Sequence, residues 1–143
     1  MPPVQKSNSK DRHFVRKDLK LQFQHLSTPN HPSSAIMAAI RTMTDYHKRI
    51  EAASDKLIVL DFYANWCGPC KDMESTVKSL ARKYSTKAVV LKIDVDKFEE
   101  LTERYKVRSM PTFVFIKNNR RLASFSGADD HKLTDMMAKL VKT

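Results

Sequence analysis

The sequence is poor in the features that mark secreted, membrane-spanning and metal-stabilised proteins. It has only two cysteines, both in one Cys-x-x-Cys motif, whereas small secreted scaffolds carry several scattered pairs. One such pair supplies too few ligands for a structural zinc site, and no cluster of histidines lies near it. The longest apolar stretches, residues 57–60 and 112–116, are far too short to span a bilayer. No apolar run of signal-peptide length occurs, so we expect a cytoplasmic or nuclear protein without a membrane partner.

Basic residues clearly outnumber acidic ones. The 143-residue chain has 26 lysines and arginines against 16 aspartates and glutamates, a net charge of +10. A field of this sign attracts polyanions, so nucleic acid is one candidate partner; a basic surface that only aids solubility is an equally good alternative. The sequence has no helix-turn-helix or zinc-finger motif, so any contact with DNA or chromatin is expected to be non-specific. The candidate contact residues are Arg82, Lys83, Lys87, Lys117, Arg120 and Arg121.

The first 36 residues differ in composition from the rest. Six lysines and arginines stand there against two aspartates, and four prolines are interspersed with serine and asparagine. Such a segment buries too little apolar surface to offset the entropy of ordering it, so residues 1–36 are predicted to be a basic, disordered extension. A mitochondrial transit peptide is a weaker alternative, because the apolar residues among the bases are spaced as in a strand. Residues 37–143 are predicted to form one domain, and Met37 is a candidate for the natural start.

From residue 37 onward the sequence alternates between strand and helix patterns. Residues 57–63 and 88–94 are nearly continuous apolar runs, typical of strands covered on both faces. We predict strands at residues 39–43, 57–63, 88–94, 112–116 and 121–125. We predict helices at residues 44–53 (capped by Thr44), 70–84, 98–105 and 133–141, with a hairpin turn at Asn118 and Asn119. The order β-α-β-α-β-α-β-β-α predicts an α/β fold in which helices flank both faces of a central mixed β-sheet.

The Cys-x-x-Cys motif follows the first long strand, in the run Trp66-Cys67-Gly68-Pro69-Cys70. Cys67 lies just before the predicted helix, where unpaired N–H groups and the helix dipole favour a thiolate, so we predict that it is the nucleophile. Cys70, in the first turn, is predicted to resolve the mixed disulfide, and Pro69 suits a helix start. A lone Cys-x-x-Cys is a weak signal because metal-binding knuckles share it. The complete run of residues 66–70 directly after a buried strand is a specific signal for a redox-active dithiol.

This run resembles a known active site. Residues 61–71 are similar to the active site of thioredoxins, and residues 110–113 to their cis-proline segment. The resemblance covers residues 37–143, and within the family the basic character resembles a germline-specific member. It implies the thioredoxin fold and a protein-disulfide reductase with no bound cofactor, recycled by thioredoxin reductase with electrons from NADPH. Its implied partners are that reductase and disulfide-bonded proteins; DNA-associated, disulfide-linked chromosomal proteins of germ cells are a narrower hypothesis.

The resemblance also implies roles for residues outside the dithiol. Asp61 would be a buried carboxylate with a raised pKa that accepts the proton of Cys70, and Lys92 would be its neighbour. The Met110–Pro111 bond would be cis and would present the Met110 backbone to an extended substrate. The other implied substrate-contacting residues are Trp66, Gly68, Pro69, Arg108 and Gly127. The alternatives are a solvated Asp61, an ordinary surface Lys92 and a solvated Arg108.

Four positions depart from the usual thioredoxin pattern, among them Tyr63 and Asn119. Ser75 replaces the proline that kinks the active-site helix in many members. Ser109 stands where some animal cytosolic thioredoxins carry an extra cysteine, so we expect a monomer without a disulfide through that site.

Two functions compete with a reductase. An oxidase or isomerase of the same fold is disfavoured by Gly68 and Pro69, because oxidising relatives usually place a histidine between the cysteines. A basic docking module, bound to chromatin or protein with little redox turnover, is the second alternative.

Overall fold

A single mixed sheet of five strands, in the order β1-β3-β2-β4-β5, organises the domain. The computed structural model describes residues 36–143, so the predicted extension, apart from Ile36, lies outside the described residues. The strands are β1 (Met37–Ala39), β2 (Leu57–Tyr63), β3 (Ala88–Asp94), β4 (Thr112–Lys117) and β5 (Arg120–Ser126). β3 runs parallel to β1 and β2, whereas β4 pairs antiparallel with β2 and β5 antiparallel with β4. The predicted mixed sheet is confirmed.

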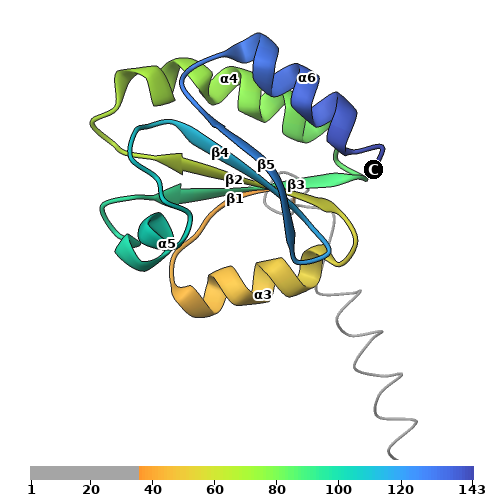
Figure 1. Ribbon diagram of the computed structural model, residues 1–143, viewed down its shortest axis with the longest axis horizontal. Helices are drawn as coiled ribbons and strands as arrows, with labels where there is room; N and C mark the ends of the chain where they lie inside the picture. The colour runs from red at the N-terminus through yellow and green to blue at the C-terminus, as the bar shows by residue number, and fades with distance from the viewer. Residues whose placement is uncertain (1–35) are drawn as a thin grey trace, which may run out of the picture. The chain divides into compact units, whose positions relative to one another are not determined.

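Helices cover both faces of the sheet (Figure 1). They are α3 (Met43–Ala53), α4 (Gly68–Lys83), α5 (Glu99–Arg104) and α6 (Asp130–Leu140). α4 and α6 lie on one face, and α3 and α5 lie on the other. The fold class predicted from the order of elements is therefore confirmed.

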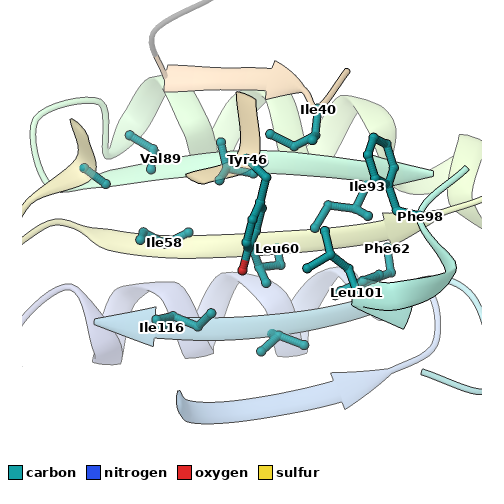
Figure 2. Close-up of a cluster of buried hydrophobic side chains, with 13 residues drawn as sticks. Ile40, Tyr46, Ile58, Leu60, Phe62, Val89, Ile93, Phe98, Leu101 and Ile116 are labelled. Carbon is teal, nitrogen blue, oxygen red and sulfur yellow. The ribbon is translucent and has the colours of Figure 1, made fainter. Parts of the chain in front are cut away.

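The central strand β2 has a hydrophobic core on each side. Leu60 lies in the cluster drawn in Figure 2, together with Tyr46 of α3 and Leu101 of α5. Its neighbour Val59 lies in a second cluster, with Leu133 of α6. Because successive side chains of a strand point to opposite faces, a strand between two cores must be apolar almost throughout. This explains the continuous apolar run from which β2 was predicted.

The first strand and the first helix begin earlier than predicted. β1 ends at Ala39, the residue at which the predicted strand began. Thr42, and not Thr44, caps α3: its side chain accepts a hydrogen bond from the Asp45 amide over 3.0 Å. The Asp45 carboxylate in turn accepts from the Arg41 amide over 3.1 Å. This reciprocal arrangement resembles a capping box, and the Thr-x-x-Asp spacing was the signal for it.

The start of α4 and the turn between β4 and β5 test two further predictions. α4 begins at Gly68 rather than at residue 70, because Pro69 in the first turn needs no amide partner. The helix continues through Ser75 to its end. Asn118 and Asn119 have φ values of 51° and 62°, so the predicted hairpin turn is confirmed.

The packing of α6 on the sheet predicts the effect of shortening Leu133, which is 1% exposed. Leu133→Ala is expected to lower the free energy of unfolding by about 2–4 kcal/mol, because it removes packed methyl groups and leaves a cavity. Leu122→Ala removes the same atoms from a side chain that is 41% exposed. It is expected to lower the free energy by less than about 1 kcal/mol. Urea denaturation followed by circular dichroism measures both values, and equal losses would contradict the described packing.

Candidate active site

The two cysteines lie where the chain enters α4. Cys67 caps the N-terminus of the helix, and Cys70 lies in the first turn. The Cys70 amide donates a hydrogen bond to Cys67 Sγ over 3.1 Å. The cysteines form a disulfide, with their Cα atoms 5.3 Å apart. A helix N–H directed at sulfur stabilises negative charge there, so this geometry suits Cys67 as a thiolate nucleophile.

Both cysteines are buried in the disulfide form, with exposed fractions of 4% and 7%. A thiolate that attacks a target disulfide must be reached by the target, whereas the resolving thiol works best when it is shielded. The described form lacks this contrast, because the bonded sulfurs pack together against Met110. The residues around them are open to solvent: Gly68 and Pro69 are exposed, and Trp66 is 67% exposed. Trp66 therefore belongs to the surface beside the dithiol and not to the core.

Two aspartates at the end of β3 hold this surface, and the sequence analysis missed both. The indole Nε1 of Trp66 donates to Asp96 Oδ2 over 2.9 Å. The buried Asp94 accepts from the Asp96 amide over 3.0 Å, and its Oδ2 lies 3.5 Å from Asn65 Nδ2. Asp94 is the register partner of Tyr63 at the end of β2. The Asp-x-Asp spacing where a second parallel strand ends is the signal that could have found them.

The segment before β4 also packs against the disulfide. The Met110–Pro111 bond is cis, as the family resemblance implied, and Met110 contacts the cysteine cluster. The Gly127 amide donates to the Pro111 carbonyl over 2.8 Å. Its φ of 108° is a conformation that residues with a Cβ rarely adopt. Arg108 is exposed and lines a shallow depression at the C-terminal end of α5.

Asp61 is a carboxylate inside the sheet, with an exposed fraction of 6%. Burial raises its pKa from the ordinary 3.8 to about 7; Lys92 opposes this change and Glu74 adds to it. Lys92 is its register partner on β3, and the Lys92 side chain is 16% exposed. Asp61 is therefore not solvated, and Lys92 is half-buried.

Glu74 was missed by the sequence analysis. Its Oε1 lies 3.5 Å from Lys92 Nζ, and this ammonium lies 4.5 Å from the centre of the Tyr63 ring. Glu74 follows Cys70 by four residues, which places both on one face of α4. That spacing is the signal that could have found it.

The comparisons with known proteins identify the family. The family model for thioredoxin matches residues 37–139. The chain belongs to the thioredoxin family. It is 92% identical over 106 residues to Thioredoxin-1 of Drosophila yakuba, covering 74% of this chain and 99% of the relative. It is 40% identical over 102 residues to human thioredoxin, covering 71% and 96%.

A similar solved structure is that of Deadhead, described as a germline-specific thioredoxin of Drosophila melanogaster. It matches with a TM-score of 0.72 at 88% identity, over 73% of this chain and 99% of that one. The predicted thioredoxin fold and the resemblance to a germline-specific member are confirmed. As a thioredoxin, the protein is a thiol–disulfide oxidoreductase, which confirms the predicted enzyme class.

Thioredoxins need no bound cofactor. Across residues 36–143 of this thioredoxin, no group of three or more histidine, cysteine, aspartate or glutamate side chains gathers as a metal site. None of the helices described is both long and apolar enough to cross a membrane.

The predicted nucleic-acid residues of this thioredoxin lie at the end of the sheet that is remote from the dithiol. They are Arg82 and Lys83 at the end of α4, Lys87 before β3, and Lys117, Arg120 and Arg121 at the β4–β5 turn. All but Lys117, which is half-buried, are exposed. Leu57 pairs with Ala88 and Ile58 with Ile116, so both groups flank the start of β2. The dithiol follows the other end of this strand, roughly 20 Å away.

The buried carboxylate predicts a pH-dependent gain of stability from Asp61→Asn. A carboxyl with a raised pKa holds a proton in the folded state but not in the unfolded state between about pH 4 and pH 7, so stability is lost as pH rises through this window. Asparagine does not ionise. Asp61→Asn is therefore expected to raise the free energy of unfolding by roughly 2–4 kcal/mol more at pH 8 than at pH 4.

Urea denaturation of the oxidised proteins at both pH values measures this difference without titrating thiols. Asp72→Asn, at an exposed position of α4, is the matched control and is expected to have the same small effect at both. A gain from Asp61→Asn that did not depend on pH would contradict the raised pKa.

Proposed function

We propose that this thioredoxin reduces protein disulfides, with Cys67 as the nucleophile and Cys70 as the resolving cysteine. The Cys67 thiolate attacks one sulfur of the target disulfide, forms a mixed disulfide and releases the first target thiolate. The Cys70 thiolate then attacks Cys67 Sγ and releases the second target thiolate. The two electrons that reduce the target come from the cysteine pair, which ends as the intramolecular disulfide.

The hydrogen bond from the Cys70 amide to Cys67 Sγ carries this proposal. It gives Cys67 the stabilised negative charge that a nucleophile and a good leaving group both need. Cys70 lies within disulfide distance, so the mixed disulfide can be resolved without a large movement of the chain.

Asp61 is proposed to accept the proton of Cys70 during resolution. Its side chain lies on the face of the sheet that α4 covers, because it follows Leu57 and Val59 at intervals of two residues and these pack in the α4 cluster. A pKa of about 7 leaves a large fraction of the carboxyl ionised at neutral pH while keeping it basic enough to take a proton.

The substrate is proposed to bind across the exposed Trp66, Gly68 and Pro69 and to pair with the Met110 backbone as an extended strand. Gly127 and Arg108 border this surface in the proposal. Thioredoxin reductase, using NADPH, is proposed to return the disulfide to the dithiol. This step supplies the two electrons for the next cycle.

A narrower role follows from the basic residues at the far end of β2. All but Lys117 are exposed there, none has a part in the dithiol chemistry, and the similar Deadhead structure is described as germline-specific. We propose that they hold the protein on DNA without sequence preference while the dithiol reduces disulfide-linked chromosomal proteins in germ cells, in the nucleus or cytoplasm. A docking module with little redox turnover is not favoured, because the cysteine pair is already at disulfide distance.

The two cysteine roles predict different failures in an insulin reduction assay. Cys67→Ser is expected to reduce turnover to the uncatalysed background, because no thiolate remains to attack. Cys70→Ser is expected to attack once and then stall, because nothing resolves the mixed disulfide. Turbidity measures turnover, and a non-reducing gel with mass spectrometry detects the trapped adduct. Turnover of Cys70→Ser at the wild-type rate would contradict the assignment.

The DNA role predicts that reversing Arg120 and Arg121 separates binding from catalysis. The variant with both residues changed to Glu is expected to bind duplex DNA at least several-fold more weakly and to reduce insulin at the wild-type rate. Binding by the unchanged protein is expected to be roughly micromolar at low salt and to weaken steeply as salt rises, because counterions are released. Fluorescence anisotropy measures both effects.

The matched control changes Lys48 and Lys139, two exposed lysines on α3 and α6, to Glu. It alters net charge equally and is expected to weaken binding less. If the protein showed no DNA binding at about 20 mM salt, the chromatin role would be wrong.

A further inference from the structure

The Lys92 ammonium interacts with three side chains, one on α4 and two on β2. Nζ lies 3.5 Å from Glu74 Oε1 and 4.5 Å from the centre of the Tyr63 ring. Asp61 lies directly opposite Lys92 in the β2–β3 register. Among the described residues, the ion pair of Lys92 is with Glu74 and not with Asp61. The cation therefore sits beside the buried carboxylate while its closest anionic partner is on α4.

This arrangement follows from the periodicities of the elements. Asp61 and Tyr63 are two residues apart on β2, so they share the face that α4 covers. Cys70 and Glu74 are four residues apart on α4, so the helix presents the resolving cysteine and the carboxylate on one side. Glu74 is thereby the residue of α4 that can hold Lys92 without entering the apolar interior, since its side chain is 48% exposed.

The elements packed around Asp61 carry few charged or titratable groups. Lys92 and the buried Asp94 belong to β3, and Tyr63 belongs to β2 itself. α4 contributes Glu74 and Cys70, with Cys67 as its N-cap, whereas β4 opposes Asp61 with the apolar Phe113. Of these groups, Lys92 lowers the pKa of Asp61 and Glu74 raises it. Lys92 is the only cation of this set, and its ion pair with Glu74 weakens the electrostatic stabilisation of the Asp61 carboxylate. Glu74 also repels the negative charge of Asp61 directly.

We propose that Glu74 is a positioning residue for proton transfer at Asp61, acting by holding the Lys92 ammonium in a shared ion pair beside the Tyr63 ring. The effect is to keep Asp61 basic enough near neutral pH to take the proton of Cys70. This inference rests on the proposed role of Asp61 as proton acceptor. It assigns to an exposed helix residue, outside the Cys-x-x-Cys run, control over the pH range of disulfide reduction.

The test measures the protonation of Asp61 directly. In ¹³C NMR titrations of the oxidised protein, Glu74→Gln is expected to lower the midpoint of the Asp61 carboxyl by about half a pH unit or more, because Lys92 is released toward it. Asp72→Asn removes the same charge from an exposed position of the same helix that does not belong to this set, and it is expected to leave the midpoint nearly unchanged. Glu74→Lys is expected to lower the midpoint further.

Two further measurements test whether the effect passes through Lys92 and whether it is electrostatic. In a Lys92→Met background, Glu74→Gln is expected to shift the midpoint by less than half as much, because only direct repulsion remains. At about 1 M NaCl the shift is expected to shrink in the Lys92-containing protein, because Glu74 is exposed and screened. The salt measurement does not depend on the stability of any Lys92 variant. An equal shift by Asp72→Asn, or an undiminished shift without Lys92, would overturn the proposal.

The pH dependence of single-turnover disulfide reduction separates this inference from the proposed function. Glu74→Gln is expected to move the acid limb of the rate profile to lower pH by the amount seen in the NMR titration. If Asp61→Asn left the profile unchanged, the proton-acceptor role would be wrong and the inference with it. If Asp61→Asn removed the acid limb but Glu74→Gln did not move it, the inference alone would be wrong.

Discussion

One hydrogen bond, from the Cys70 amide to the Cys67 sulfur, defines the chemistry of this protein. It forms because β2 ends just before α4, so that the first cysteine becomes the helix cap and the second lies in the first turn. Pro69 stabilises that turn without requiring an amide partner. The two hydrophobic cores that enclose β2 hold this junction in place, because alternate side chains of the strand are packed on its opposite faces. The dithiol geometry is thus a consequence of how the central strand is buried.

The same burial creates a conflict at Asp61. A carboxylate in the central strand is unfavourable for folding, and its pKa rises as a result. Lys92 lowers the pKa of Asp61 and Glu74 raises it. The resulting pKa of about 7 allows Asp61 to exchange a proton near neutral pH. In the proposed mechanism, the same three charges set both stability and reactivity. The exposed surface beside the dithiol has a separate contact, in which Trp66 donates a hydrogen bond to Asp96.

The local pattern of apolar residues predicted the long strands more accurately than the other elements. β2 and β3 begin and end at the predicted residues, because a run buried on both faces is apolar almost throughout and is bounded by polar turns. The pattern failed at β1 and at the start of α3, where Thr42 and Thr44 both have the chemistry of a cap. The choice between them depends on the chain leaving the sheet after Ile40, whose amide donates to the Lys92 carbonyl over 2.9 Å.

By itself, the sequence determined the order of the elements and the position of the dithiol before a helix, since each depends on residues that are neighbours in the chain. The cis-proline segment was implied by the resemblance to the family. Only the tertiary structure decided that Lys92 pairs with Glu74, that Trp66 bonds to Asp96, and that the basic groups flank the end of β2 remote from the cysteines. These contacts join residues far apart in the sequence. They exist because β3 and β4 pair with β2 in one register and α4 packs on that sheet. No local periodicity of the sequence encodes this arrangement.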